Sequence, residues 1–347
     1  MAAGESGNTV QTCVPCDDCL CDMPLIDLAP FMLDEGAVTG EDMTPAQANI
    51  AEQLQAVNSA DGFAYICGLG IAEEDIEEWF DASKSLFSLP DTAKQQLSRL
   101  VPEANTGYSF VGQERLNCNR GPDLKESFNI RRPCLGKNNF VGCPKLFQTA
   151  VPAMWAKLEV AMERYALACS LALGLEPDFL SRKMLQKDLC TLRFLHYPPC
   201  DFEPDAAVGG SGSIRIGEHT DFGLFTFLFM DGPAHGLEVK KVEGGEFDGS
   251  EHASGWKAVR GPGGARFVVN TGTLFARLTN DCWKATAHRV VVPSAEAACQ
   301  HRFSIACFVD PDANAEVAVD PRFGEPKYPP TTGLEYILMK LREANPN

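Results

Sequence analysis

The amino-acid sequence predicts a mainly β fold with flanking helices, in which the second half of the chain forms an antiparallel sandwich or jelly roll. Three observations lead to this expectation. The 347 residues are 45% apolar, which is enough for a sizeable core. Helical spacing of apolar residues prevails up to about residue 187. Short runs of β-branched and aromatic residues then follow one another from about residue 188 to 310.

The N-terminal part is expected to alternate short strands with helices. Residues 24–28 and 63–67 are strand-like because apolar residues dominate both runs. Thr44 is a favoured N-cap residue and Pro45 a favoured first residue, so a helix should begin there. A second helix is predicted from about Glu73, where acidic residues in the first turn suit the helix dipole.

The middle of the chain combines an irregular segment with the longest predicted helix. Residues 103–130 contain two strand-like pieces around a polar loop, and long loops in compact domains are often functional. Residues 149–174 carry Met, Leu and aromatic side chains at helical spacing and end at a glycine. We interpret this stripe as core packing and not as a cofactor site.

The strand-like pieces of the second half are separated by Gly, Pro and Asn, which is typical of sandwiches and jelly rolls. They are LRFLHYPP, the stretch around His219, GLEVKK, GWKAVR, ARFVVN, TLFARLT, ATAHRVVV and RFSIACFV. A final helix is predicted over residues 331–344. Residues 24–347 are therefore expected to form one domain.

Charge and composition narrow the function. A net charge of −17 would repel nucleic acid and anionic lipid, so we expect no partner of either kind and a small-molecule substrate instead. No uninterrupted apolar run is long enough to cross a membrane. The first residues lack the features of a secretory signal, and the 14 cysteines do not resemble a disulfide framework. We therefore expect a cytoplasmic protein.

Residues 1–23 form a cysteine-rich tail without apolar periodicity. Cys13, Cys16, Cys19 and Cys21 give the pattern C-x2-C-x2-C-x-C. Such density could bind zinc or an iron–sulfur cluster. The alternative is a flexible tail whose thiols have no specific role.

His219 and Asp221 are the first candidates for metal ligands. Residues i and i+2 of an extended chain project from the same face, so this imidazole and carboxylate can bind one ion. A turn histidine beside a capping aspartate would look the same. His288, in another β-rich run, is the best remaining partner, although a buried core histidine is the simpler interpretation of that residue alone.

Two imidazoles and one carboxylate leave three coordination positions open, which suits Fe(II) that binds a chelating co-substrate and O2. Zinc, in contrast, is usually four-coordinate, with a single water beside three protein ligands. Arg302 and Ser304 alternate along one strand and share a face. A buried guanidinium is costly unless it is paired, so Arg302 implies an acidic small molecule or a structural salt bridge.

These residues carry a family resemblance. GEHTD, AHRV and R-x-S in RFSIACF, together with LRFLHYPPC, KESFNI and LFSLP, resemble the iron(II)- and 2-oxoglutarate-dependent dioxygenases of the isopenicillin N synthase-like group. The resemblance implies a distorted double-stranded β-helix, or jelly-roll, core. It also implies that His219, Asp221 and His288 hold Fe(II).

The same resemblance implies that Arg302 and Ser304 bind the distal carboxylate of 2-oxoglutarate with help from Tyr197, and that Phe308 faces the substrate. The implied reaction consumes O2, releases succinate and CO2, and oxidises an unactivated C–H bond. Hydroxylation, desaturation and oxidative cyclisation remain open, and biosynthesis of a specialised metabolite is the expected setting. An oxidase of the same fold that does not use 2-oxoglutarate, and a non-catalytic binding protein, are the alternatives.

The irregular segment is expected to contribute to the substrate pocket. Tyr108, Phe110 and Phe128 are the candidates for apolar walls, and Asn105 is a polar candidate. Arg193 could meet a carboxylated substrate.

Overall fold

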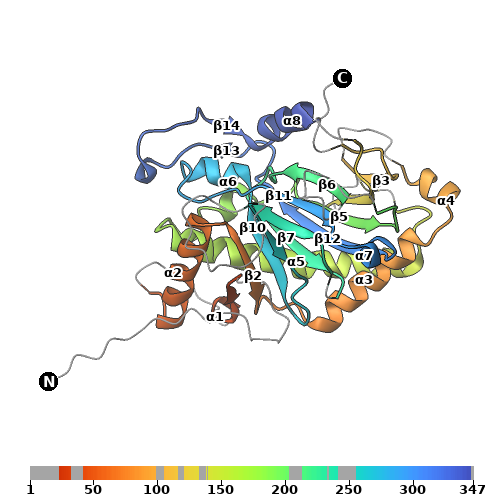
Figure 1. Cartoon of the computed structure of the whole chain (residues 1–347). Helices are drawn as coiled ribbons and strands as arrows, with labels where there is room; N and C mark the ends of the chain where they lie inside the picture. The colour runs from red at the N-terminus through yellow and green to blue at the C-terminus, as the bar shows by residue number, and fades with distance from the viewer. Residues whose placement is uncertain are drawn as a thin grey trace.

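Two sheets face each other at the centre of the fold (Figure 1). The computed structural model describes residues 23–32, 42–98, 105–115, 121–132, 138, 140–202, 213–232, 234–240 and 255–344. Within them, the larger sheet has the order β1-β2-β10-β7-β12-β5-β4-β3 and the smaller one β6-β11-β8-β9. All pairings are antiparallel except that of β1 with β2. The strands are β1 (Leu25–Asp27), β2 (Phe63–Cys67), β3 (Gly107–Ser109), β4 (Glu126–Arg131), β5 (Thr191–Tyr197), β6 (Ser213–His219), β7 (Phe225–Met230), β8 (Leu237–Lys240), β9 (Trp256–Val259), β10 (Phe267–Thr271), β11 (His288–Val292) and β12 (Arg302–Val309).

A small apolar cluster joins the inner faces of the two sheets. Leu195, Tyr197 and Ala306 come from the larger sheet, and Ile216 and Val290 come from the smaller one. Because side chains alternate between the faces of a strand, the intervening residues of β5 and β12, such as Phe194, Ile305 and Cys307, point to the opposite side, toward the helices. The mainly β fold with a jelly-roll core is therefore confirmed.

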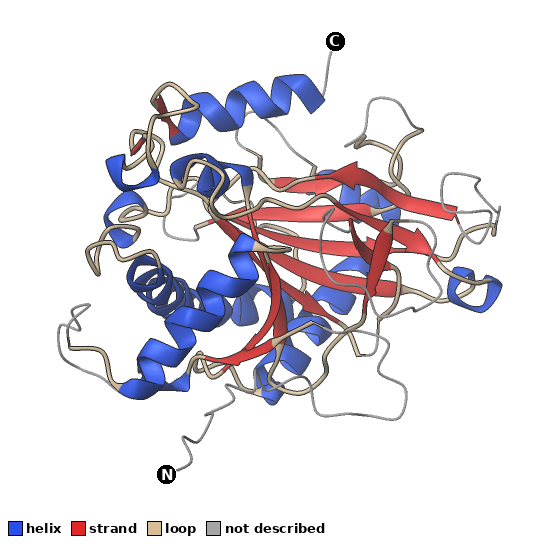
Figure 2. Ribbon diagram, turned by 60° about the vertical axis from the view of Figure 1, so that its left-hand side comes forward, coloured by secondary structure: helices blue, strands red, loops and turns tan. Residues whose placement is uncertain are grey.

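Helices cover the outer face of the larger sheet (Figure 2). Thr44 caps α2 in a capping box with Gln47, and acidic residues fill the first turn of α3, as the sequence predicts. The described helices are α1 (Ala29–Met32), α2 (Pro45–Ser59), α3 (Glu73–Phe87), α4 (Asp91–Gln96), α5 (Lys145–Ala172), α6 (Thr273–Leu278), α7 (Ala295–Ala298) and α8 (Gly333–Ala344), with 3-10 turns η3 (Ser181–Lys183) and η5 (Pro321–Phe323). No described helix is both long and apolar enough to cross a membrane.

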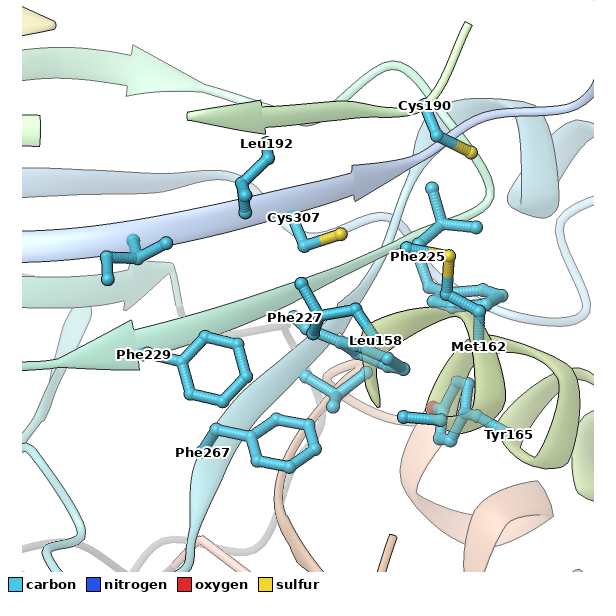
Figure 3. Packing of buried hydrophobic residues seen from close by; sticks show 14 of the residues in the cluster. Leu158, Met162, Tyr165, Cys190, Leu192, Phe225, Phe227, Phe229, Phe267 and Cys307 are labelled. Carbon is cyan, nitrogen blue, oxygen red and sulfur yellow. The ribbon is translucent and has the colours of Figure 1, made fainter. Parts of the chain in front are cut away.

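Aromatic side chains of β7 form the contact between the sheet and these helices (Figure 3). The ring of Tyr165, on α5, lies 4.8 Å from that of Phe225, and the ring of Trp79, on α3, lies 5.2 Å from that of Phe229. The apolar stripe of α5 is thus core packing, as expected. This packing fixes β7, whose N-terminal end follows the His219 to Asp221 segment.

Three expected elements differ in the structure. TLFARLT is not a strand but contains α6, whose first N–H groups bond to the carbonyls of Asp221, Phe222 and Gly223. These bonds satisfy donors that the start of a helix otherwise leaves unpaired. The long helix begins four residues earlier than predicted, at Lys145. Residues 331–332 form strand β14, which pairs with β13 (Glu316–Val317), so the last helix starts at Gly333.

The cysteine pattern Cys13, Cys16, Cys19 and Cys21 lies outside the described residues, so the metal-binding hypothesis for the tail stays a prediction. The described cysteines are free thiols, and half of them are buried.

A charged network lies between β4, β5 and the helices. The Glu126 carboxylate accepts hydrogen bonds from Lys94 Nζ at 2.8 Å and from the Tyr108 hydroxyl, and it lies 2.6 Å from His196 Nδ1. Burial alone would raise the pKa of Glu126, but His196, Lys94 and Tyr108 bring this pKa below its ordinary value of 4.5. The ionised carboxylate is therefore part of the folded structure.

Replacing Glu126 by glutamine is expected to lower the free energy of unfolding by about 3 kcal/mol at pH 7, because a buried charge network loses its centre. Since the folded pKa lies below the unfolded value, Glu126 stabilises the protein above pH 4.5 and less as the pH falls. The difference between variant and wild type should shrink in acid, which urea unfolding at several pH values measures. Asp178→Asn, which removes the partner of Arg182 in an ion pair with both side chains exposed, is the control and should change stability by less than about 1 kcal/mol.

Candidate metal centre and its cavities

Paired strands bring the three predicted metal ligands together. His219 ends β6, His288 begins β11, and the two are direct partners in the antiparallel register. Their ring centroids are 4.3 Å apart. His288 Nε2 lies 3.7 Å from Asp221 Oδ1, and one potential ligand atom from each residue lies within 4.8 Å of the others.

Hydrogen bonds orient each of these side chains. Asp221 Oδ2 accepts from Thr226 Oγ1 at 2.6 Å and from Asn270 Nδ2 at 2.8 Å, which leaves Oδ1 directed at the imidazoles. His219 Nδ1 lies 2.8 Å from the Gly217 carbonyl, so it carries the proton and Nε2 is the free lone pair. His288 Nδ1 lies 3.4 Å from the Thr286 carbonyl. Such contacts fix the tautomer and direction of metal-binding histidines.

The protonation states fit metal binding. Burial, and then the proximity of His288, lowers the pKa of His219 from 6.5 to about 3. Burial alone would raise the pKa of Asp221, but the two histidines, with Asn270 and Thr226, hold it below its ordinary value. Metal ligands must be neutral imidazole and ionised carboxylate. Two nitrogens and one oxygen on one side of an ion are the donor set that non-haem Fe(II) takes.

Two glycines allow the loop that carries Asp221 to lie close to the larger sheet. A Cβ atom at Gly223 would lie 2.2 Å from Asp310 Oδ1 and 2.7 Å from the Val309 carbonyl oxygen. A Cβ atom at Gly272 would lie 2.2 Å from the Gly223 carbonyl oxygen. Any side chain at either position would therefore displace the loop that carries Asp221.

Replacing Thr226 by valine is expected to weaken Fe(II) binding by about 10- to 100-fold, because the Asp221 carboxylate loses the donor that orients it. Isothermal titration with Mn(II) under anaerobic conditions measures the change. The neighbouring Thr271→Val is the control, since its hydroxyl bonds to Asn58 and not to Asp221. Equal metal affinity of the two variants would contradict the role of Thr226.

Arg302 lies at the other end of the inner face. Its side chain is almost fully buried, with Nε donating to the His235 carbonyl at 3.1 Å and Nη1 to Ser304 Oγ at 3.4 Å. Its guanidinium carbon lies 4.7 Å from the centroid of the Tyr197 ring, and Tyr197 is its partner on β5. Among the described residues no carboxylate lies within salt-bridge distance of Arg302. This is the arrangement expected for an arginine that binds an acidic ligand.

A cavity of about 110 Å³ opens beside His219 and Asp221. Three of the predicted substrate residues line it: Asn105, Arg193 and Phe308. The Arg193 guanidinium carbon lies 5.6 Å from the Phe308 ring centroid, and its Nε donates to Asn129 Oδ1 at 2.9 Å. Asn129 also donates to Asn105 Oδ1 at 2.8 Å, so one buried amide positions both polar residues.

Tyr108, Phe110 and Phe128 do not line this cavity. Tyr108 bonds to Glu126, Phe128 packs edge-on against Phe147 of α5 at 5.5 Å, and Phe110 is half exposed. The reason is strand alternation: Phe128 and Phe194 are partners that both face the helices. Their neighbours Asn129 and Arg193 point to the opposite side, where Arg193 lines the cavity and Asn129 bonds to Arg193.

Several cavity residues were missed by the sequence interpretation. Arg131 and Asp310 line it, and burial, offset by Arg131 and reinforced by Asp221, raises the pKa of Asp310 to about 7. Arg131 is the last residue of β4, and Asp310 directly follows β12. A charged residue at the end of a predicted strand is the feature of the sequence that could have indicated each of them. Ile337 and Leu341 of α8 form an apolar wall, which no local pattern could have indicated.

Two family models match most of the chain. The family model described as the 2OG-Fe(II) oxygenase superfamily matches residues 188–311. The model described as the N-terminal part of non-haem dioxygenases in morphine synthesis matches residues 23–148.

Relatives cover most of the chain. The 2-oxoglutarate-Fe(II) type oxidoreductase ppzD of Metarhizium rileyi is 32% identical over 308 residues, which are 81% of each chain. The oxidoreductase hxnY of Emericella nidulans is 29% identical over 89% of this chain and 86% of its own. A full-length Neurospora crassa protein, solved in complex with alpha-KG and thymine, is 26% identical with a TM-score of 0.73, over 92% of this chain and 96% of its own.

The fold and these matches define the class of the protein: it is a 2-oxoglutarate-dependent dioxygenase, an oxidoreductase that uses Fe(II), 2-oxoglutarate and O2. The chain belongs to the 2OG-Fe(II) oxygenase superfamily.

Proposed function

We propose that His219, Asp221 and His288 hold the Fe(II) of this dioxygenase. The observation that carries the proposal is that their ligand atoms lie within 4.8 Å of one another, in a buried site whose hydrogen bonds leave one lone pair of each group free. When bound, the iron supplies activation of O2 at the expense of 2-oxoglutarate. The protein supplies the orientation of the ligands and the exclusion of water.

Arg302, Ser304 and Tyr197 are proposed to bind the distal carboxylate of 2-oxoglutarate. The buried guanidinium has no acidic partner among the described residues, and Ser304 Oγ lies beside it. A carboxylate would accept hydrogen bonds from both groups. The apolar cluster of Leu195, Ile216 and Val290 would then surround the rest of the co-substrate and keep water from it.

The substrate is proposed to be a small molecule that occupies the cavity beside His219 and Asp221. Its oxidation at an unactivated C–H bond would be coupled to the conversion of 2-oxoglutarate and O2 into succinate and CO2, with hydroxylation, desaturation or oxidative cyclisation as the outcome. Where the substrate radical lies relative to the reacting oxygen decides among these outcomes. A role in the biosynthesis of a specialised metabolite accords with this chemistry.

Residues 24–347 are proposed to act as a single oxygenase domain. One hydrophobic cluster extends from Ile26 of β1 to Ile337 of α8, which supports this interpretation.

A carboxylate or another acceptor on the substrate is proposed to meet Arg193. Arg193→Met is expected to raise the substrate KM about tenfold or more and to leave the KM for 2-oxoglutarate unchanged, because Arg193 lines the cavity beside His219 and Asp221 and not the cavity beside Arg302. Steady-state kinetics on an identified substrate measures both constants. Arg193→Lys is the matched variant that keeps the charge, and an unchanged substrate KM in Arg193→Met would contradict the contact.

A screen of small metabolites for succinate formation by the Fe(II)-loaded enzyme tests the proposed function. Succinate released in step with consumption of one compound is the expected result, and His219→Ala should release none. Substrate consumed without succinate would instead favour an oxidase that does not use 2-oxoglutarate. Loss of substrate-dependent turnover in every condition would favour a binding protein.

A further inference from the structure

Arg215 is, like Arg302, a buried arginine that has no carboxylate partner among the described residues. It lies on β6, and only 3% of its surface is exposed. Its Nη2 is 3.3 Å from the Pro198 carbonyl and 3.4 Å from the Gln300 carbonyl, both of which are long contacts. Its Nε is buried and has no hydrogen-bond partner within the part of the chain that the structure describes. In the described part of the chain no carboxylate lies within 4 Å of Arg215.

Arg215 and Arg302 share their surroundings. Their guanidinium carbons lie 5.8 and 4.7 Å from the centroid of the same ring, that of Tyr197. Both residues line one cavity of about 180 Å³, together with His235 and His301. The only carboxylate among the described lining residues is Asp231, which is paired with Lys84 of α3 at 3.0 Å.

A single anion between or beside two buried like charges would offset the cost of burying both. A ring face contributes about 2 kcal/mol or more to a desolvated cation, whereas removing an ion from water costs several kcal/mol. The contacts with Tyr197 therefore offset only part of the cost of burying the two guanidinium groups. A carboxylate has two oxygens with about four acceptor sites, so one such group can bind two guanidinium groups at once.

We infer that Arg215 is a second binding residue for the distal carboxylate of 2-oxoglutarate, which it holds together with Arg302. The inference rests on the proposed role of Arg302. Arg215 does not belong to the substrate cavity, because the cavity with His219, Asp221 and Arg193 shares no lining residue with the one that contains Arg215. The co-substrate would thus be recognised by a pair of arginines at its distal end.

Binding to the Mn(II)-loaded full chain, measured by isothermal titration, tests this inference with two ligands. One is 2-oxoglutarate and the other is 2-oxopentanoate, in which a methyl group replaces the distal carboxylate. Arg215→Gln is expected to weaken 2-oxoglutarate binding by about 30-fold or more, the effect of removing one partner of a buried charge pair. It should leave 2-oxopentanoate binding unchanged. The kcat at saturating 2-oxoglutarate should also be unchanged while its KM rises.

Two further variants keep the test decisive. Arg215→Lys retains the charge but not the planar guanidinium, so it should bind 2-oxoglutarate more tightly than Arg215→Gln and less tightly than the wild type. If Arg215→Gln does not fold, Arg215→Lys provides the measurement. The exposed Arg182→Gln is the control and should bind both ligands like the wild type.

Equal weakening of both ligands by Arg215→Gln, or no weakening of either, would overturn the inference. Two 2-oxoglutarate molecules per chain, with only the second affected, would overturn it as well, because the two arginines would then serve separate sites. Arg302→Gln separates this failure from that of the proposed function. If Arg302→Gln loses 2-oxoglutarate while Arg215→Gln does not, only the role of Arg215 is wrong. If both retain it, the co-substrate site itself is misplaced.

Discussion

Replacing Asp221 by alanine is expected to reduce 2-oxoglutarate turnover by at least about 10³-fold. The carboxylate is the only acidic member of the proposed ligand set, and a catalytic metal contributes several kcal/mol to the stabilisation of the transition state. Iron content and succinate formation should therefore fall together. The far-UV circular dichroism spectrum should remain that of the wild type, since the loop is also held by backbone bonds to α6.

Glu218→Gln is the matched control for Asp221→Ala. Glu218 precedes His219 on β6, but its side chain is exposed and pairs with Lys240 at 2.7 Å. Loss of its charge should leave iron content and turnover unchanged. Full turnover in Asp221→Ala with iron still bound would show that the three residues are not the metal site.

Replacing Arg302 by methionine is expected to weaken 2-oxoglutarate binding by at least about 30-fold, because a buried carboxylate would lose its main partner. The thermal stability of the ligand-free protein should not fall. Arg302 is buried without an acidic partner in the described structure, so its removal eliminates a desolvated charge. Thermal unfolding with and without 2-oxoglutarate measures both effects.

The stabilisation by 2-oxoglutarate separates the two interpretations of Arg302. In the wild type, saturating ligand should raise the melting temperature by mass action, and in Arg302→Met this increase should disappear. A large fall in the melting temperature of the ligand-free variant would instead indicate that Arg302 is a structural residue. Arg182→Met, at an exposed position, should behave like the wild type.

The residue pairs at the two ends of the inner face could be predicted from the sequence, because the arrangement of each pair depends only on its spacing along the chain. His219 with Asp221, and Arg302 with Ser304, are i and i+2 pairs, and an extended chain places such pairs on one face whatever the rest of the fold does. The choice of His288 as the third ligand instead required the other histidines to be excluded one by one. The pairing of β6 with β11 then places it beside His219.

The walls of the substrate cavity could not be predicted in the same way. Phe128 and Asn129 are neighbours on β4, and only the helices packed against one side decide which of them faces the cavity. Ile337 and Leu341 come from α8, far away in sequence. The sequence predicts a strand where α6 lies because a short apolar run fits both periodicities, and the carbonyls of residues 221–223 provide the bonds that favour a helix there.

The direct pairing of His219 with His288 also bears on how the chain folds. A shift of β11 by one residue would turn Arg289, not His288, toward the inner face. An ion held by both imidazoles at the proposed site would stabilise only the aligned pair, so bound metal would also favour the observed register of β6 and β11.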